Sequence, residues 1–155
     1  MEPQQRLDFF QPGDQTALVC LDVPEVQRIV VDQLTALGYK IHTGVFVDDA
    51  QLKMRAHPYD LIFVSEHFNA ADIETNAVVL ETLHAPAEQR RRQLVVVIGS
   101  SFVTNDHMQA FEHSVDLVVA LADVVSLSPV LRRGLVRFRE FYAPWHEALR
   151  AAEAA

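Results

Sequence analysis

The sequence predicts an α/β domain built on a parallel sheet of five strands with helices on both faces. Short apolar runs alternate five times with segments whose apolar residues recur every three or four positions. The runs, and thus the expected strands, lie at residues 17–21, 40–45, 61–64, 94–98 and 117–121. Three of them are almost continuous in valine, isoleucine, leucine and phenylalanine, which is typical of strands buried on both faces. The second run alternates between apolar and polar residues, which favours an edge strand.

Helices are expected in the intervening segments. The first begins at Pro24, a residue tolerated in a first helical turn, and ends at Gly38. Its apolar stripe runs from Val26 to Leu37 with helical spacing. The other four are expected from a cap at Asp48 or Asp49 to Ala56, over residues 76–85, from a cap at Asn105 or Asp106, and from Ser128 followed by Pro129.

The apolar stripes of the last two helices are expected to face the sheet. They comprise Met108, Phe111 and Val115 in the fourth helix, and Leu131, Leu135, Phe138 and Tyr142 in the fifth. Strict alternation of strands and helices with right-handed crossovers predicts a flavodoxin-like, doubly wound sheet of order 2-1-3-4-5. We expect residues 1–15 to form an N-terminal extension, residues 16–143 the domain, and residues 144–155 a C-terminal helical tail or linker.

Composition narrows the function classes. The chain has 155 residues, of which 50% are hydrophobic and 22% charged, as in an ordinary globular domain. The formal net charge of −8 disfavours binding to a nucleic-acid backbone. Cys20 is the only cysteine, which excludes an internal disulfide and a multi-cysteine zinc site. Because no signal peptide or membrane-spanning run is visible, we expect a cytoplasmic protein without a membrane partner.

Two motifs at matching distances carry a family resemblance. The first is Leu21-Asp-Val-Pro-Glu-Val-Gln-Arg28 with Leu37-Gly-Tyr39, and the second is His57-Pro-Tyr-Asp-Leu-Ile-Phe-Val-Ser65. The separation of Gly99 from Asp116 fits the same pattern. From Thr16 to about Tyr142, the chain resembles the receiver domain of bacterial two-component response regulators. The resemblance implies the receiver-like version of the predicted fold and a role in signalling.

The resemblance also implies a phosphorylation pocket at the carboxyl ends of the strands. In receiver domains two acids after the first strand and an aspartate ending the third hold Mg²⁺, and that aspartate accepts a phosphoryl group. A threonine or serine after the fourth strand and a lysine ending the fifth stabilise the product. The positions that match in this chain are Leu21 and Asp22, Ser65 (or Glu66 after a shift of one residue), Gly99 followed by Ser100, and Leu121.

Most of the chemistry of that pocket is therefore missing from the sequence. A serine is no carboxylate nucleophile, one acid holds Mg²⁺ poorly, and no lysine follows Lys53. We expect Leu21 and Leu121 to pack together and fill the space of a charged pocket. The resulting hypothesis is a pseudo-receiver: a non-enzymatic signalling or scaffold module, without cofactor or metal, that acts by binding proteins. Its vestigial pocket comprises Asp22, Ser65, Glu66, Gly99, Ser100 and Leu121.

The fifth helix supplies the candidate interaction surface. Phe141, Trp145 and Leu149 are spaced four residues apart, on a different side from the expected core stripe, and continue past Pro144. Exposed aromatic side chains on a soluble domain indicate a contact site. We expect a homodimer, or docking of another protein, through this helix and the tail, at a surface comprising Arg132, Arg133, Arg137, Phe141, Trp145 and Leu149.

Other functions remain open from the sequence. A small-molecule or metal-binding domain, including an enzyme, would use the pocket around Asp22, Ser65, Glu66, His67 and Ser100, with His107 on the same face. An atypical receiver would take phosphate on Glu66 or Ser65. Gly99-Ser100-Ser101 lacks the second glycine of a hydrolase nucleophile turn, so a serine hydrolase is disfavoured.

Overall fold

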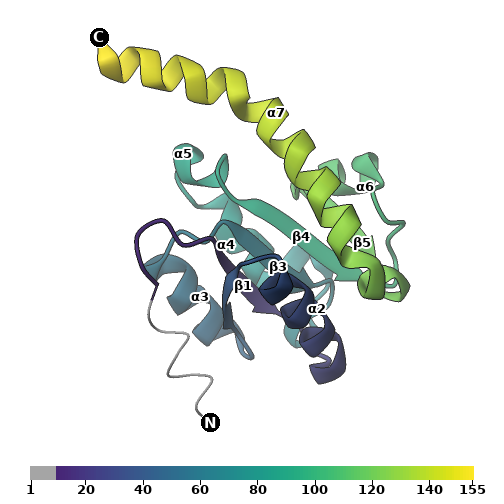
Figure 1. Cartoon of the computed structure of the whole chain (residues 1–155). Coiled ribbons are helices and arrows are strands. Elements are labelled where there is room, and N and C mark those ends of the chain that lie inside the picture. Colours follow the sequence, from purple (N-terminus) through teal and green to yellow (C-terminus); the bar gives the residue numbers. More distant parts are fainter. Residues whose placement is uncertain (1–9) are drawn as a thin grey trace.

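A parallel sheet of five strands forms the centre of the molecule, as a computed structural model describing residues 10–155 shows (Figure 1). The strands are β1 (Thr16–Cys20), β2 (Lys40–Thr43), β3 (Leu61–Ser65), β4 (Leu94–Gly99) and β5 (Leu117–Ala120). Their order is β2-β1-β3-β4-β5, and every neighbouring pair is parallel. The predicted fold, strand order and edge position of the second strand are confirmed.

Helices cover both faces of the sheet. They are α2 (Pro24–Ala36), α3 (Val47–Ala56), α4 (Ala77–Leu83), α5 (Ala87–Arg90), α6 (His107–Glu112) and α7 (Leu127–Ala154). Three short 3₁₀ helices, η1 (Phe68–Ala70), η2 (Ile73–Thr75) and η3 (Leu121–Ser126), join them. Helices α2 and α7 share one buried cluster with the sheet, and α3, α4 and α6 share the other. Helix α5 and the 3₁₀ turns were not predicted, because such short segments carry no apolar period.

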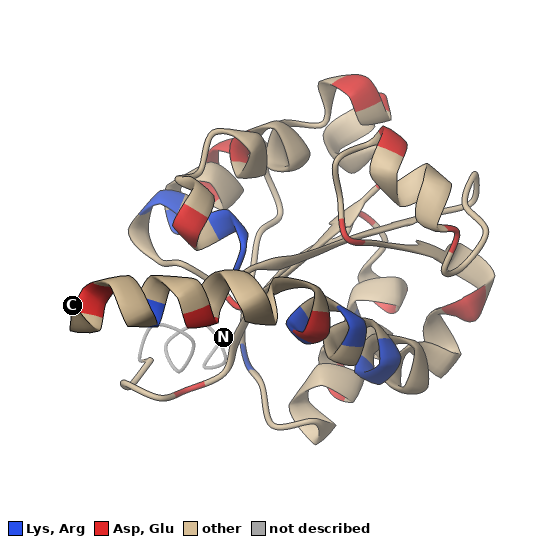
Figure 2. Cartoon of the chain, turned by 90° about the horizontal axis from the view of Figure 1, so that it is seen from above, with Lys and Arg blue, Asp and Glu red and all other residues tan. Residues whose placement is uncertain are grey.

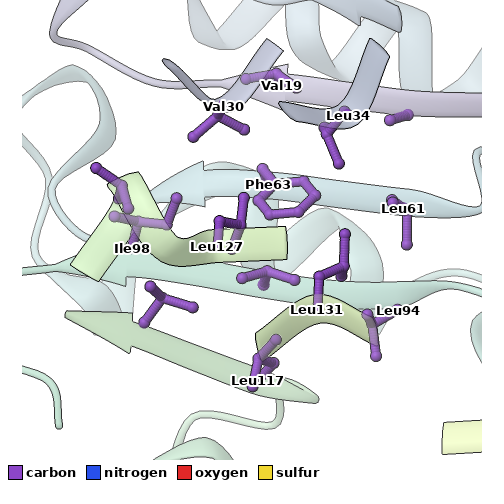
Figure 3. Close-up of a cluster of buried hydrophobic side chains, with 14 of the residues drawn as sticks. Val19, Val30, Leu34, Leu61, Phe63, Leu94, Ile98, Leu117, Leu127 and Leu131 are labelled. Carbon is purple, nitrogen blue, oxygen red and sulfur yellow. The ribbon is translucent and has the colours of Figure 1, made fainter. Parts of the chain in front are cut away.

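The core divides according to the alternation of side chains along each strand. Val19 and Phe63 lie in the cluster under α2 and α7, whereas their neighbours Leu18 and Ile62 lie in the opposite cluster. Figure 3 shows the first cluster, in which Leu127 of α7 meets side chains from the strands and from α2. Because β1, β3 and β4 are buried on both faces, their nearly continuous apolar runs are explained, whereas the edge strand β2 is only partly buried.

Of the three predicted caps, the one at Asp106 is confirmed and the other two are wrong. Asp106 accepts hydrogen bonds from the first backbone N–H groups of α6, and Asn76, where the third helix was expected to begin, caps α4 in the same way. Asp48 and Asp49 instead lie in the first turn of α3, where acidic side chains stabilise the helix by complementing its dipole. Ser128 also lies inside the first turn of its helix, because α7 begins one residue earlier.

The stripe predicted for the fourth helix is wrong. Met108 and Phe111 of α6 are 66% and 77% exposed. The small side chain of Ala110 packs on the sheet instead, and Val115 is buried beyond the end of the helix. A helix of six residues presents less than two turns, so one alanine suffices to seat it. Two large apolar side chains are consequently left facing solvent.

Helix α7 is longer than the sheet requires. It contains 28 residues and continues through Pro144, so the expected boundary at residue 144 falls inside it. Figure 1 shows the yellow end of this helix turning and extending beyond the strands. A proline lacks the backbone N–H of a helical hydrogen bond and commonly bends a helix. Within residues 10–155, no helix is long and apolar enough to cross a lipid bilayer.

Candidate functional site

The predicted pocket residues meet where β1, β3 and β4 end. Asp22 follows β1, Ser65 ends β3, and Gly99 ends β4. The N–H of Glu66 donates to the carbonyl of Ile98 at 2.9 Å, which continues the β3–β4 pairing by one residue. This bond holds the backbone of Glu66 beside Gly99.

The hydroxyl of Ser65 has a structural partner. The backbone N–H of Asp22 donates to Ser65 Oγ at 3.0 Å, so the side chain at the acceptor position of a receiver links β3 to the loop after β1. This hydrogen bond keeps Ser65 Oγ against the backbone of the loop after β1. The contact that Ser65 makes in the structure therefore fixes that loop to β3.

Glu66 fills the space above Gly99. Its carboxylate is buried, with only 6% of the residue exposed. A Cβ atom built on Gly99 would lie 2.2 Å from Glu66 Oε1 and 2.6 Å from Glu66 Cβ. The Ser101 N–H donates to Oε1 at 3.3 Å, and His67 Nε2 lies 3.5 Å from Oε2. Glu66 therefore occupies the volume in which a side chain at position 99 would stand.

Asn69 is a site residue that sequence reasoning missed. Its N–H donates to Asp22 Oδ1 at 3.2 Å, and its side-chain oxygen accepts from the Val47 N–H at 2.9 Å. Its amide nitrogen donates to the Val45 carbonyl at 3.1 Å. Asn69 has φ of 55°, a left-handed conformation that asparagine tolerates better than most residues. It joins three loops at this end of the sheet, and the sequence signals none of those contacts.

Asn76 is the second residue that was missed as part of the site. It is fully buried, and its amide nitrogen donates to the carbonyls of Ser65 and Glu66 at 2.9 and 3.2 Å. Its oxygen caps α4. A cap at this asparagine could be predicted from the sequence. The hydrogen bonds to the loop after β3 could not, because they depend on how α4 packs beside that loop.

Leu21 and Leu121 do not share the arrangement expected for them. Leu21 is buried in the cluster under α2 and α7, but Leu121 is 40% exposed and lies outside both buried clusters. The reason is that β5 ends at Ala120 and Leu121 begins the 3₁₀ helix η3. The expected burial of Leu121 is wrong. Ser100 lies in an exposed turn after β4.

The residues present do not fit Mg²⁺. Among residues 10–155, no three histidine, cysteine, aspartate or glutamate side chains converge on one point. Asp22 already accepts a bond from Asn69, and the Glu66 carboxylate contacts Ser101 and His67. Mg²⁺ requires oxygen ligands in near-octahedral geometry, usually one or two carboxylates together with waters. His107, at the start of α6, is exposed.

A second candidate site is the surface formed by α6 and α7. Phe111 and Phe141 are 77% and 76% exposed and line a groove of about 370 Å³ between the two helices. Arg137, on the wall of this groove, donates to Asn105 Oδ1 at 3.2 Å. Of the six residues predicted for the interaction surface, four are exposed and two are half-buried; the exposed ones are Arg132, Arg133, Arg137 and Phe141, and the half-buried ones are Trp145 and Leu149.

Trp145 makes a contact within its own chain. The guanidinium carbon of Arg91 lies 4.6 Å from the centre of the indole, as in a cation–π pair. Figure 2 shows the basic segment of residues 90–92 beside the C-terminal half of α7. Trp145 is therefore less available to a partner than Phe141.

Comparison with solved structures identifies the fold. No protein-family model and no curated protein matches the sequence. HP1043, an orphan response regulator of H. pylori, is 18% identical, with a TM-score of 0.58 over 81% of this chain and 99% of that one. The chemotaxis response regulator CheY4 of Vibrio cholerae is 13% identical, with a TM-score of 0.57 over 78% and 98%. A two-component response regulator from Clostridium difficile is 16% identical, with a TM-score of 0.54 over 77% and 98%. The chain thus has the fold of response-regulator receiver domains.

Proposed function

We propose that this chain is a pseudo-receiver, a signalling module that keeps the receiver fold but is not phosphorylated and acts by binding proteins. One observation carries the proposal: the buried side chain of Glu66 stands against Gly99, in the place of the hydroxyl side chain of a receiver. The side chains at the two positions are sterically complementary, because a Cβ atom at position 99 would lie 2.2 Å from Glu66 Oε1.

The other pocket residues support the same conclusion. Ser65 offers a hydroxyl already engaged by the Asp22 N–H, whereas an acyl phosphate requires a carboxylate. The position of the lysine holds the half-exposed Leu121, which offers no positive charge to a phosphoryl product. Asn69 and Asn76 tie the surrounding loops together in a fixed arrangement. These hydrogen bonds stabilise the loops at the carboxyl ends of the strands, so the residues here have a structural role.

The nucleophiles of the chain also favour a module without enzymatic activity. Cys20 is buried, and that burial raises the pKa of its thiol to about 12, which keeps the sulfur protonated and unreactive. Ser100 lies in an exposed turn, and within residues 10–155 no histidine is hydrogen-bonded to it or to Ser65. Nucleophilic catalysis requires a base within reach of the attacking oxygen.

The surface between α6 and α7 is the proposed docking site, and the proposed occupant is a second copy of this chain. Phe111 and Phe141 expose apolar surface along this groove, and Met108 on α6 is also exposed; soluble domains rarely leave large apolar surface uncovered. A stable dimer commonly buries about 800 Å² on each partner, with aromatic anchors near the centre. We also place this module in the cytoplasm, where two-component signalling operates.

The docking prediction is tested by sedimentation velocity on the intact chain. We expect a dimer at high micromolar concentration and a monomer for the Phe111→Ser/Phe141→Ser variant, because that variant removes both aromatic anchors. A control variant, Phe46→Ser/Leu52→Ser, changes two equally exposed apolar side chains on the α3 side and should remain dimeric.

Two further chains separate the roles of the groove and the tail. A chain that ends after Ala143 and the Trp145→Ala variant should both still dimerise, because Trp145 contacts Arg91 of its own chain. A wild type that stays monomeric at every concentration would contradict the docking proposal. Equal dissociation of the Phe111→Ser/Phe141→Ser variant and of its control, Phe46→Ser/Leu52→Ser, would also contradict it.

A further inference from the structure

A cavity lies at the opposite end of the sheet from the vestigial pocket. It has a volume of about 520 Å³ and is bounded by the starts of β3 and β4, the segment of residues 13–15 before β1, and the second half of α7. The long helix forms one wall because it continues beyond the strands (Figure 1). A volume of this size suits a small-molecule site, for which roughly 300–1,000 Å³ is usual.

Four arginines line this cavity although the protein as a whole is acidic. They are Arg91, Arg92, Arg139 and Arg150, which come from the loop before β4 and from α7. The chain has 13 basic residues in all and a net charge of −8. Four of these residues lie around one cavity, where their like charges repel one another and destabilise the fold. A bound anion would reduce this repulsion.

The acidic residues of the cavity do not neutralise these arginines. Asp14 forms an ion pair with Lys40 at 3.0 Å, and Asp60 accepts from the Thr16 N–H at 2.8 Å. Arg139 and Arg150 have no hydrogen bond or ion pair within residues 10–155. Their guanidinium groups remain available to a ligand.

His146 lies among the same charges. Its Nδ1 atom is buried and has no hydrogen-bond partner within the described part of the chain. Burial and the charges of Arg92 and Arg150 lower the pKa of His146, an effect that the backbone of Arg91 only partly offsets. The cavity thus disfavours one more positive charge, which is the expected property of a site for anions.

Apolar side chains form much of the remaining lining. Leu135, Phe138 and Ala143 of α7 line the cavity and are half-buried, whereas Tyr39 and Leu94, on the sheet side, are almost fully buried. An inorganic anion would leave the three side chains of α7 uncovered. A ligand with a flat apolar part beside its charged groups would satisfy both kinds of lining.

We propose that this cavity binds a nucleoside diphosphate or triphosphate, with the phosphates on the arginines and the base against Phe138 and the neighbouring apolar side chains of α7. A guanidinium group matches phosphate oxygens with two parallel hydrogen bonds. Such a ligand would give the module an input other than aspartyl phosphate. The inference does not depend on the proposed function, because it uses residues at the other end of the sheet.

The test is calorimetric titration of the intact chain with ADP, ATP and pyrophosphate, followed in parallel by fluorescence of Trp145, the only tryptophan. We expect both nucleotides to bind, pyrophosphate to bind more weakly, and the fluorescence to change as Arg91 turns toward phosphate. Arg139→Gln/Arg150→Gln should weaken ADP binding by about tenfold or more, because charged hydrogen bonds to phosphate are lost.

The matched control is Arg28→Gln/Arg55→Gln, which removes the same charge from exposed positions outside the cavity. We expect its affinity for ADP to stay within about twofold of the wild type, because neither side chain touches the ligand. Equal losses in both double variants would show a nonspecific charge effect and overturn the site. No binding of either nucleotide, or pyrophosphate binding as tight as ADP, would also overturn the proposal.

Discussion

The Gly99→Thr variant is expected to be less stable to urea than the wild type by about 3 kcal/mol, because inserting atoms into a packed site forces neighbours out of place. The new Cβ would lie 2.2 Å from Glu66 Oε1, and the Glu66 backbone is held by its bond to Ile98. The carboxylate would have to leave its buried position and the Ser101 N–H. Restoring the hydroxyl of a receiver is therefore predicted to damage this protein.

A double-mutant cycle with Glu66→Gly, which removes the whole side chain including Cβ, tests the steric reason. The Gly99→Thr/Glu66→Gly variant should be more stable than Gly99→Thr alone, with a coupling free energy of at least about 1 kcal/mol. The control is Ser100→Thr, which adds a methyl group at the neighbouring exposed position and should change stability by less than about 0.5 kcal/mol. Additive losses at positions 66 and 99 would show that these side chains do not compete for space.

The Arg90→Met variant is expected to lose about 3 kcal/mol of stability at pH 7, because breaking an ion pair leaves a poorly solvated charge behind. Arg90 Nη1 lies 2.8 Å from Asp116 Oδ2, and the side chains of this pair are only 19% and 16% exposed. The same carboxylate oxygen accepts from the Val95 N–H at 2.8 Å, which holds the pair at the start of β4. Methionine keeps the length and apolar surface of arginine while removing its charge.

The loss should depend on pH in a defined direction. Burial raises the pKa of Asp116 above its ordinary value of 3.8, and Arg90 and the Val95 N–H oppose that rise. Without Arg90 the folded carboxyl binds a proton more readily than the unfolded one, so acidification favours the folded state between the two pKa values. The difference in urea stability between Arg90→Met and the wild type should shrink from pH 7 to pH 5.

Arg92→Met provides the control for that measurement. Arg92 is exposed and lies 3.8 Å from an exposed glutamate, so its replacement should cost less than about 1 kcal/mol at either pH. A loss for Arg90→Met that is small, or that grows as the pH falls, would contradict the assignment of a buried ion pair.

The sheet was predictable because strands that are buried on both faces appear in the sequence as nearly continuous apolar runs. Every expected strand is present, and the ends differ by one or two residues. The packing of α6 was not predictable, because Met108 and Phe111 have the period of a core stripe although Ala110 makes the contact. A pattern of large apolar residues cannot show that a short helix approaches the sheet through its smallest side chain.

The sequence was sufficient to predict where the site lies, but not which side chains in it contact one another. Asp22, Ser65, Glu66 and Gly99 do come together, because parallel strands end at the same edge. From the sequence, Gly99 indicates only the loss of a hydroxyl. That this loss makes room for Glu66 follows from the pairing of β3 with β4, and the bonds of Asn69 follow from a left-handed turn.

The central claim, that the receiver fold here has lost phosphorylation, is tested most directly by the intact mass after incubation with acetyl phosphate and Mg²⁺. A receiver domain known to accept phosphate under the same conditions is the positive control. We predict an unchanged mass, because Ser65 is engaged by Asp22 and Glu66 is packed against Gly99. A gain of one phosphoryl group that disappears in the Ser65→Ala/Glu66→Ala variant would contradict the account.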